Sequence, residues 1–213
     1  ARRLAAYLRT LADDRGRLPL IGDDDGGQLF RFQAPRPADA SPTLGVAAAL
    51  LEDPSLAVKP VAEEMCWILG RVPDGREVRA SGVPSAWPSR VMRDSGYFVS
   101  RTADGGHLVF DAGPHGFLNG GHAHADALSV VLSVGGEPLF VDPGTATYTM
   151  DRAVRDRFRS SRMHNTLVLD GRDHAMPKGP FQWHSRADAR FLVARTGPDL
   201  DFAVATHDGY EPG

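Results

Sequence analysis

The chain has 213 residues, of which 42% are hydrophobic, enough for one large domain or two small ones. Its formal net charge of −3 argues against a broadly basic surface, so we expect no nucleic-acid partner. The single cysteine, Cys66, excludes an internal disulfide, and no apolar run approaches the length of a membrane span. The chain opens on Ala rather than Met and ends abruptly, so we expect a fragment of a longer protein, and the missing signal peptide says nothing about compartment.

The first third of the sequence predicts helices. Residues 3–11 mix Leu and Ala with charged residues, as an amphipathic helix does. The acidic, glycine-rich residues 22–27 predict a solvated turn rather than a calcium loop, because the terminal Glu of a helix-loop-helix site is lacking. Residues 41–51 predict a second helix, and residues 59–69 predict a third with a proline in its first turn.

The rest of the sequence predicts strands. Residues 75–89 are rich in Pro, Gly and Ser, and we interpret them as a linker between a helical part and a strand part. Glycine-containing turns then join three pairs of short apolar segments: residues 97–100 with 107–110, 127–134 with 138–141, and 186–194 with 201–206. A further strand is expected at residues 166–169, and residues 151–162 predict a short helix or an ordered loop. Hairpin spacing favours an antiparallel sheet, so the fold class is α+β.

Two histidines at a spacing of two residues are the first candidate site. His122, His124 and Asp126 would point to one face if the segment were a strand, because side chains alternate with a period of two. The glycines at 120 and 121 allow close approach of the backbone to a ligand. A pair of core histidines bonded to backbone carbonyls explains this segment equally well.

Two later residues strengthen the metal interpretation. Asp142 ends the apolar run 139–141, and His164 precedes the apolar run 166–169. Each has an ordinary structural explanation, a turn-forming Asp and a histidine at a strand edge. Together with His124 they supply two imidazoles and one carboxylate, a ligand set that suits Zn²⁺ and leaves a position for water.

His122 is then the histidine left over, able to reach a cleft without binding the metal. Histidine is the side chain that ordinarily exchanges a proton near neutral pH, so this residue suits proton transfer or the stabilisation of a developing anion. Tyr148 is a second candidate for proton transfer, although an aromatic ring packed on the sheet is the more common role. The five arginines within residues 152–162 are either a solvated surface or an attraction for an anionic substrate.

Several of these segments carry a family resemblance, with matching order and approximate spacing over residues 95–175. The chain resembles the C-terminal half of the heparinase II/III-like polysaccharide lyases in residues 121–129, 141–145, 158–160 and 164–171. Residues 19–26 are similar to a loop late in the helical toroid of that family, and residues 207–210 to a later strand end.

The resemblance implies an architecture and a reaction. Residues 1–72 would be the tail of an (α/α) toroid, and residues 73–213 an antiparallel β-sandwich truncated at its C-terminus. The family cleaves uronate-containing polysaccharides, glycosaminoglycan- or alginate-like, by β-elimination, in the periplasm or outside the cell. His122 matches its sandwich-borne catalytic histidine, and His124, Asp142 and His164 match the ligands of a mainly structural zinc.

The family's other catalytic groups, an Asn or His and a Tyr, come from the toroid upstream of this chain. The spacing of Tyr148 from Asp142 is short for a second, sandwich-side tyrosine, and this chain alone is expected to carry only half of an active site. A non-catalytic, metal-stabilised carbohydrate-binding sandwich is the main alternative. A cupin-type metal barrel fits less well, because no Glu follows the histidine pair within residues 125–129. An anionic polysaccharide is the expected partner, and the sequence does not indicate an oligomeric state.

Overall fold

The computed structural model describes residues 1–24, 38–58, 63–71 and 87–211. Its helical part holds α1 (Arg2–Leu11), α2 (Ser41–Leu51), the 3₁₀ turn η1 (Pro54–Leu56) and α3 (Glu63–Leu69). The three expected helices are therefore present, although the expected start of the third at residues 59–62 lies outside the described residues. So do residues 25–27 of the acidic turn and residues 75–86 of the expected linker.

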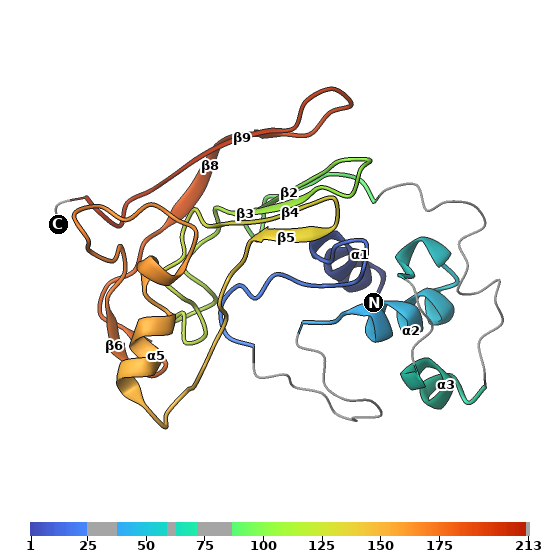
Figure 1. The fold of residues 1–213 in the computed structure, drawn as a ribbon, viewed down its shortest axis with the longest axis horizontal. Coiled ribbons are helices and arrows are strands. Elements are labelled where there is room, and N and C mark those ends of the chain that lie inside the picture. The colour runs from blue at the N-terminus through green and yellow to red at the C-terminus, as the bar shows by residue number, and fades with distance from the viewer. Residues whose placement is uncertain (25–37, 59–62, 72–86, 212–213) are drawn as a thin grey trace.

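The strand part is antiparallel throughout the described residues (Figure 1). A five-stranded sheet contains β1 (Arg90–Met92), β2 (Tyr97–Arg101), β3 (His107–Asp111), β4 (Val130–Val134) and β5 (Glu137–Phe140), in that order. Two further ribbons pair β6 (Pro177–Gly179) with β7 (Gln182–Trp183), and β8 (Ala189–Arg195) with β9 (Phe202–His207). All three predicted hairpins are confirmed, and the chain is an α+β protein whose sheets do not close.

Alternation along β3 explains how the layers assemble. Phe110 points to the face covered by the β8–β9 ribbon, where its ring centre lies 6.1 Å from that of Phe191. Ser100 on β2 donates to Asp201 beside the same ribbon at 2.7 Å. His107 points to the opposite face and bonds the carbonyl of Thr10 in α1. The five-stranded sheet is thus held between the ribbon and the first helix.

The segment after α1 leads from this helix to the loops beyond the sheet. Arg17 donates to the carbonyl of Gly136 in the β4–β5 turn at 2.6 Å, and Arg15 pairs with Glu137 at 2.9 Å. The chain then reaches the loop before β4, where the N–H of Asp23 donates to the carbonyl of His122 at 3.0 Å. A residue of the helical part is thereby placed among the predicted site residues.

Two expectations about strands are wrong. Residues 122–126 do not form the strand that a shared face would require, and the strand expected from residue 127 begins only at Val130. Residues 122–129 form turns instead, because Gly120 and Leu128 adopt positive φ of 65° and 64°, and the N–H of Ser129 bonds the carbonyl of Asp126. The expected strand at 166–169 is reduced to one bridge between Leu169 and Arg172. Its neighbours α5 (Arg152–Phe158) and η2 (Ser161–Met163) are helical, which is the first of the two alternatives expected for residues 151–162.

Candidate active site

Asp142 and His164 meet inside the protein although they come from different loops. Asp142 follows β5, and its Oδ1 accepts the N–H of Gly144 at 2.9 Å, which fixes the turn. Its Oδ2 accepts the Nδ1–H of His164, which follows η2, at 2.8 Å. Burial favours the neutral imidazole, but this hydrogen bond and the charges of Asp142 and Asp126 outweigh it and raise the pKa of His164.

His124 completes this cluster. Its ring is fully buried, and its centre lies 5.2 Å from that of His164. His124, Asp142 and His164 offer ligand atoms that all lie within 4.8 Å of one another. Within the part of the chain that the structure describes, His124 Nδ1 and His164 Nε2 are buried without a hydrogen-bond partner. Two unpaired imidazole nitrogens beside a carboxylate fit a metal ion such as Zn²⁺, since nitrogen and carboxylate oxygen are among its usual ligands.

Asp126, expected on the same face as the histidines, is not part of this cluster. Its side chain is buried among residues that turn before β4, and it lines a cleft together with Asp111. Burial raises the pKa of Asp126, and the positive charges of His164 and His124 oppose that rise only in part. Asp126, the carboxylate nearest to the histidines in sequence, is therefore not the one that contacts them.

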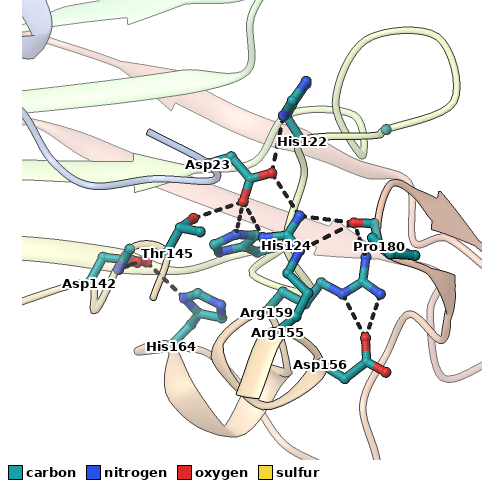
Figure 2. Close-up of polar contacts among 12 residues, drawn as sticks. Asp23, His122, His124, Asp142, Thr145, Arg155, Asp156, Arg159, His164 and Pro180 are labelled. Carbon is teal, nitrogen blue, oxygen red and sulfur yellow. Dashed lines mark hydrogen bonds and ion pairs between the residues drawn. The ribbon is translucent and has the colours of Figure 1, made fainter. Parts of the chain in front are cut away.

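The carboxylate that joins the two histidines is Asp23, whose role the sequence did not reveal (Figure 2). Its Oδ2 lies 3.1 Å from His122 Nδ1, and its Oδ1 lies 2.9 Å from His124 Nε2. Thr145 donates to Oδ1 at 2.8 Å, and Arg155 donates to both oxygens, at 2.7 Å to Oδ2. The expected solvated turn is wrong here, because the Asp23 side chain is only 1% exposed.

Asp23 is an ionised carboxylate despite its burial. Removal from water acts against the charge, but hydrogen bonds from His124, Arg155 and Thr145 and the charge of Arg155 outweigh it. The pKa of Asp23 is consequently held well below its usual range. A charged acceptor at this position fixes which nitrogen of each neighbouring imidazole carries a proton.

Two residues of the arginine-rich segment, Arg155 and Arg159, are neither solvated nor open to a substrate. Asp151 caps α5 by accepting the N–H of Val154 at 3.0 Å, and Arg155 and Arg159 then lie one turn apart with fully buried side chains. Arg159 pairs with Asp156 and donates to the carbonyl of Gly179 at 2.7 Å. These two arginines hold α5 against the Asp23 segment and the β6–β7 turn.

His122 differs from the buried side chains of Asp23, His124 and His164 because its own side chain is 71% exposed. It lines a cleft of about 580 Å³ together with Asn119, Phe117 and Phe181. The Phe181 ring centre lies 5.6 Å from that of His122. Tyr148 lies 6.5 Å from His122 between ring centres and stacks on Phe181, but it is not among the residues that line the cleft. The structure therefore brings all five predicted site residues together and exposes His122 to the cleft.

Two further histidines have internal partners. His115 packs edge-on against Trp183 at 4.4 Å between ring centres, and burial lowers its pKa to about 4. His174 accepts the N–H of Ala127 at 3.2 Å and lies 3.1 Å from the hydroxyl of Ser161. Both contacts brace the loop that carries His122 and His124, so His115 and His174 have structural roles.

Comparison with known proteins places the chain in a family. The family model described as "Heparinase II/III-like, C-terminal" matches residues 84–213, which is more than half of the chain. The chain therefore belongs to the heparinase II/III-like family, as the motif resemblance predicted. No sequence match was found among curated proteins. Among the helices of the described residues, none combines the length and the apolar character needed to cross a bilayer.

Solved structures support the same fold. A heparinase III gene product superimposes with a TM-score of 0.65 at 18% identity, over 99% of this chain and 28% of that one. Heparan sulfate lyase HepC from Pedobacter heparinus gives a TM-score of 0.63 at 20% identity, over 98% of this chain and 28% of its own. The likeness at this identity establishes the fold. The chain spans about 28% of the length of these proteins.

Proposed function

We propose that the intact protein is a polysaccharide lyase that cleaves a uronate-containing polysaccharide by β-elimination. The observation that carries the proposal is an exposed imidazole, His122, at the wall of a cleft, held from behind by a buried carboxylate. Membership of the heparinase II/III-like family supports the reaction class. Heparan sulfate is the substrate named for one solved relative, so glycosaminoglycans are the first polymers to test, with alginate-like polymers second.

The chemistry required of the site follows from the reaction. β-Elimination removes the C5 proton of the uronate, breaks the C4–O bond and returns a proton to the departing oxygen. Because the Nδ1–H of His122 donates to Asp23, its Nε2 is the nitrogen left to exchange a proton with a bound sugar. Tyr148, whose ring lies beside that of His122, is proposed as a second proton-transfer group. The remaining catalytic groups are proposed to lie in the part of the lyase that precedes this chain.

The buried cluster has a different proposed task. We assign a zinc ion to His124, Asp142 and His164, on the ground of the two unpaired imidazole nitrogens beside a carboxylate. When bound, the ion would cross-link three loops and so stabilise the wall that carries His122. This role suits a site with no exposed ligand side chain.

We also propose a domain organisation for the chain and a cellular location for the protein. Residues 1–72 are proposed as the tail of a helical toroid and residues 73–213 as a β-sandwich domain, which the change from helices to antiparallel strands supports. A periplasmic or secreted location follows from the substrate class, since uronate polymers of this kind lie outside the cytoplasm.

The experiment uses the intact protein and a panel of heparan sulfate, chondroitin sulfate and alginate, with ultraviolet absorbance to report unsaturated products. The wild type should release such products from at least one polymer. His122→Ala should lower kcat about 10²- to 10⁴-fold, the usual contribution of one proton-transfer group. The control is His184→Ala, because that histidine is exposed and lies outside the cleft.

The alternative is a carbohydrate-binding sandwich without catalysis. It predicts that the intact protein binds one of these polymers and releases no unsaturated product, with His122→Ala affecting affinity alone. Full activity in His122→Ala would remove the role proposed for this histidine.

A further inference from the structure

One carboxylate lies between the proposed metal cluster and the exposed histidine of the cleft. The two oxygens of Asp23 divide between two imidazoles: Oδ2 faces His122 Nδ1 at 3.1 Å and Oδ1 faces His124 Nε2 at 2.9 Å. Figure 2 shows Asp23 between the two rings, with His164 and Asp142 on the far side of His124. The two histidines are thereby linked through a side chain that comes from the helical part of the chain.

Each contact selects a tautomer. An ionised carboxylate only accepts hydrogen bonds, so the nitrogen that faces it must carry the proton. His124 is then protonated on Nε2, which leaves Nδ1, one of the two unpaired buried nitrogens, with a lone pair toward the metal cluster. His122 is protonated on Nδ1, which leaves Nε2 free for the cleft. One carboxylate therefore prepares both imidazoles, for different purposes.

The position of this carboxylate is itself fixed. Arg155 donates to both of its oxygens, and Thr145 donates to Oδ1 at 2.8 Å. Its own backbone N–H donates to the carbonyl of His122 at 3.0 Å, and Gly22 brings the backbone close enough for this contact. A Cβ on Gly22 would stand 2.9 Å from that same carbonyl oxygen, at a positive φ of 70°. Charge, hydrogen bonds and a local glycine thus hold Asp23 in one place.

We propose that Asp23 is the positioning residue of this site: it orients the metal ligand His124 and the cleft residue His122 through one carboxylate. Carboxylates that accept the second N–H of a metal-bound histidine raise its basicity and fix its ring, and their loss usually costs 10–100-fold in metal affinity or activity. The part concerning His122 rests on the proposed lyase function. The part concerning His124 does not depend on substrate or on catalysis.

The first test needs no substitution. Nitrogen-15 NMR of the intact wild-type protein with labelled histidine, without added metal at pH 8, reports which ring nitrogen is protonated. The proposal predicts the Nδ1–H form for His122 and the Nε2–H form for His124, each assigned by its loss in His122→Gln or His124→Gln. The opposite tautomer at both rings would overturn it.

The second test is Asp23→Asn, which keeps the shape and removes the charge. Zinc affinity, measured by competition with a chromophoric chelator, should fall about 10–100-fold. On a cleaved polymer, kcat should fall with KM little changed, because His122 would lose its orientation and not its place in the cleft. Asp199→Asn is the control, because Asp199 is exposed in the turn between β8 and β9. This substitution changes the net charge of the protein by the same amount as Asp23→Asn.

The outcomes separate the two proposals. Unchanged zinc affinity together with unchanged histidine tautomers in a folded Asp23→Asn protein would overturn the positioning role. Lack of any cleavage by the wild type would overturn the lyase proposal, while the tautomer and zinc measurements would still decide the role of Asp23 at His124. If Asp23→Asn fails to fold, the wild-type tautomers decide.

Discussion

Arg155 and Asp23 stand 132 residues apart in the chain and form an ion pair in which the two side chains are 0% and 1% exposed. The pair joins α5 of the strand part to the segment that follows α1 in the helical part (Figure 2). Because Asp23 also holds both site histidines, this single contact ties the assembly of the two parts to the geometry of the cleft.

Loss of Arg155 should therefore be costly. Arg155→Met leaves a buried carboxylate without its cation, and breaking a buried pair on one side typically costs about 3–5 kcal/mol. The free energy of unfolding of the intact protein in urea measures this. Arg152→Met is the matched control on the same helix, because Arg152 is exposed and its pair with Asp156 should contribute at most about 1 kcal/mol. Equal losses for the two variants would contradict the stabilising role of the buried Arg155–Asp23 pair.

Metal removal should lower stability through the buried cluster. A ligand that binds only the folded state at 1,000 times its Kd stabilises by about 4 kcal/mol. Zinc added to chelator-treated protein should raise Tm in the wild type and have no such effect in His164→Ala, which lacks one ligand. A Tm that responds to zinc equally in both proteins would place the ion elsewhere.

Acid should destabilise the protein in part through His107. Burial, and next the charge of Arg101, lower its pKa to about 4, below the ordinary value near 6.5. Between these values the unfolded chain binds a proton that the folded chain refuses, so stability is full above pH 6.5 and falls as the pH drops toward 4. The stability difference between wild type and His107→Gln should shrink by roughly 3 kcal/mol between pH 7 and pH 4.

His184→Gln is the control for this pH series, because it makes the same His-to-Gln replacement at an exposed position. Its stability curve should run parallel to that of the wild type. A constant gap between wild type and His107→Gln across the series would show that His107 does not contribute to acid sensitivity.

Gly22 and Gly135 offer a matched pair of glycine substitutions. Both adopt positive φ, but a Cβ at Gly22 would meet the carbonyl of His122, whereas a Cβ at Gly135 has nothing within 4 Å. Gly135→Ala should cost only the left-handed strain, about 1–2 kcal/mol. Gly22→Ala should cost more in urea unfolding and also weaken zinc binding, because it displaces Asp23. Equal stability and equal zinc affinity in the two variants would contradict the close approach.

The hairpins were predictable because their signals are local. Gly105 and Gly136 have positive φ in turns between alternating apolar segments, and the pairing of β2 with β3 and of β4 with β5 follows directly. The buried group of His124, Asp142 and His164 was also predictable in composition, since the sequence offers two imidazoles and a carboxylate beside apolar runs.

The errors have a common physical origin in long-range contacts. Nothing near Asp23 in sequence reveals a partner 132 residues away, and the glycine before it was the one local hint that the backbone approaches another segment. Clustered arginines usually mean a solvated face, but Arg155 and Arg159 recur with Val154 and Phe158 at a spacing of four, which a buried helix face also produces.

The false strand at 166–169 shows the limit of apolar patterning. The side-chain amide of Asn165 donates to the carbonyls of Val130 and Val141. These two carbonyls therefore accept hydrogen bonds from a side chain and not from the backbone of an additional strand. Asp170 and Gly171 then turn the chain with positive φ of 54° and 65°. The apolar character of residues 166–169 predicted burial in a sheet, whereas the side chains of Leu167 and Leu169 are exposed in the described part of the chain.

The most direct test of the central claim is the mass of the products that the intact protein releases from a uronate polymer. β-Elimination forms a C4=C5 double bond, so each new non-reducing end should be one water molecule lighter than the product of hydrolysis. We expect such unsaturated oligosaccharides from the wild type and almost none from His122→Ala. Fully hydrated products, or no cleavage of any uronate polymer, would contradict that claim.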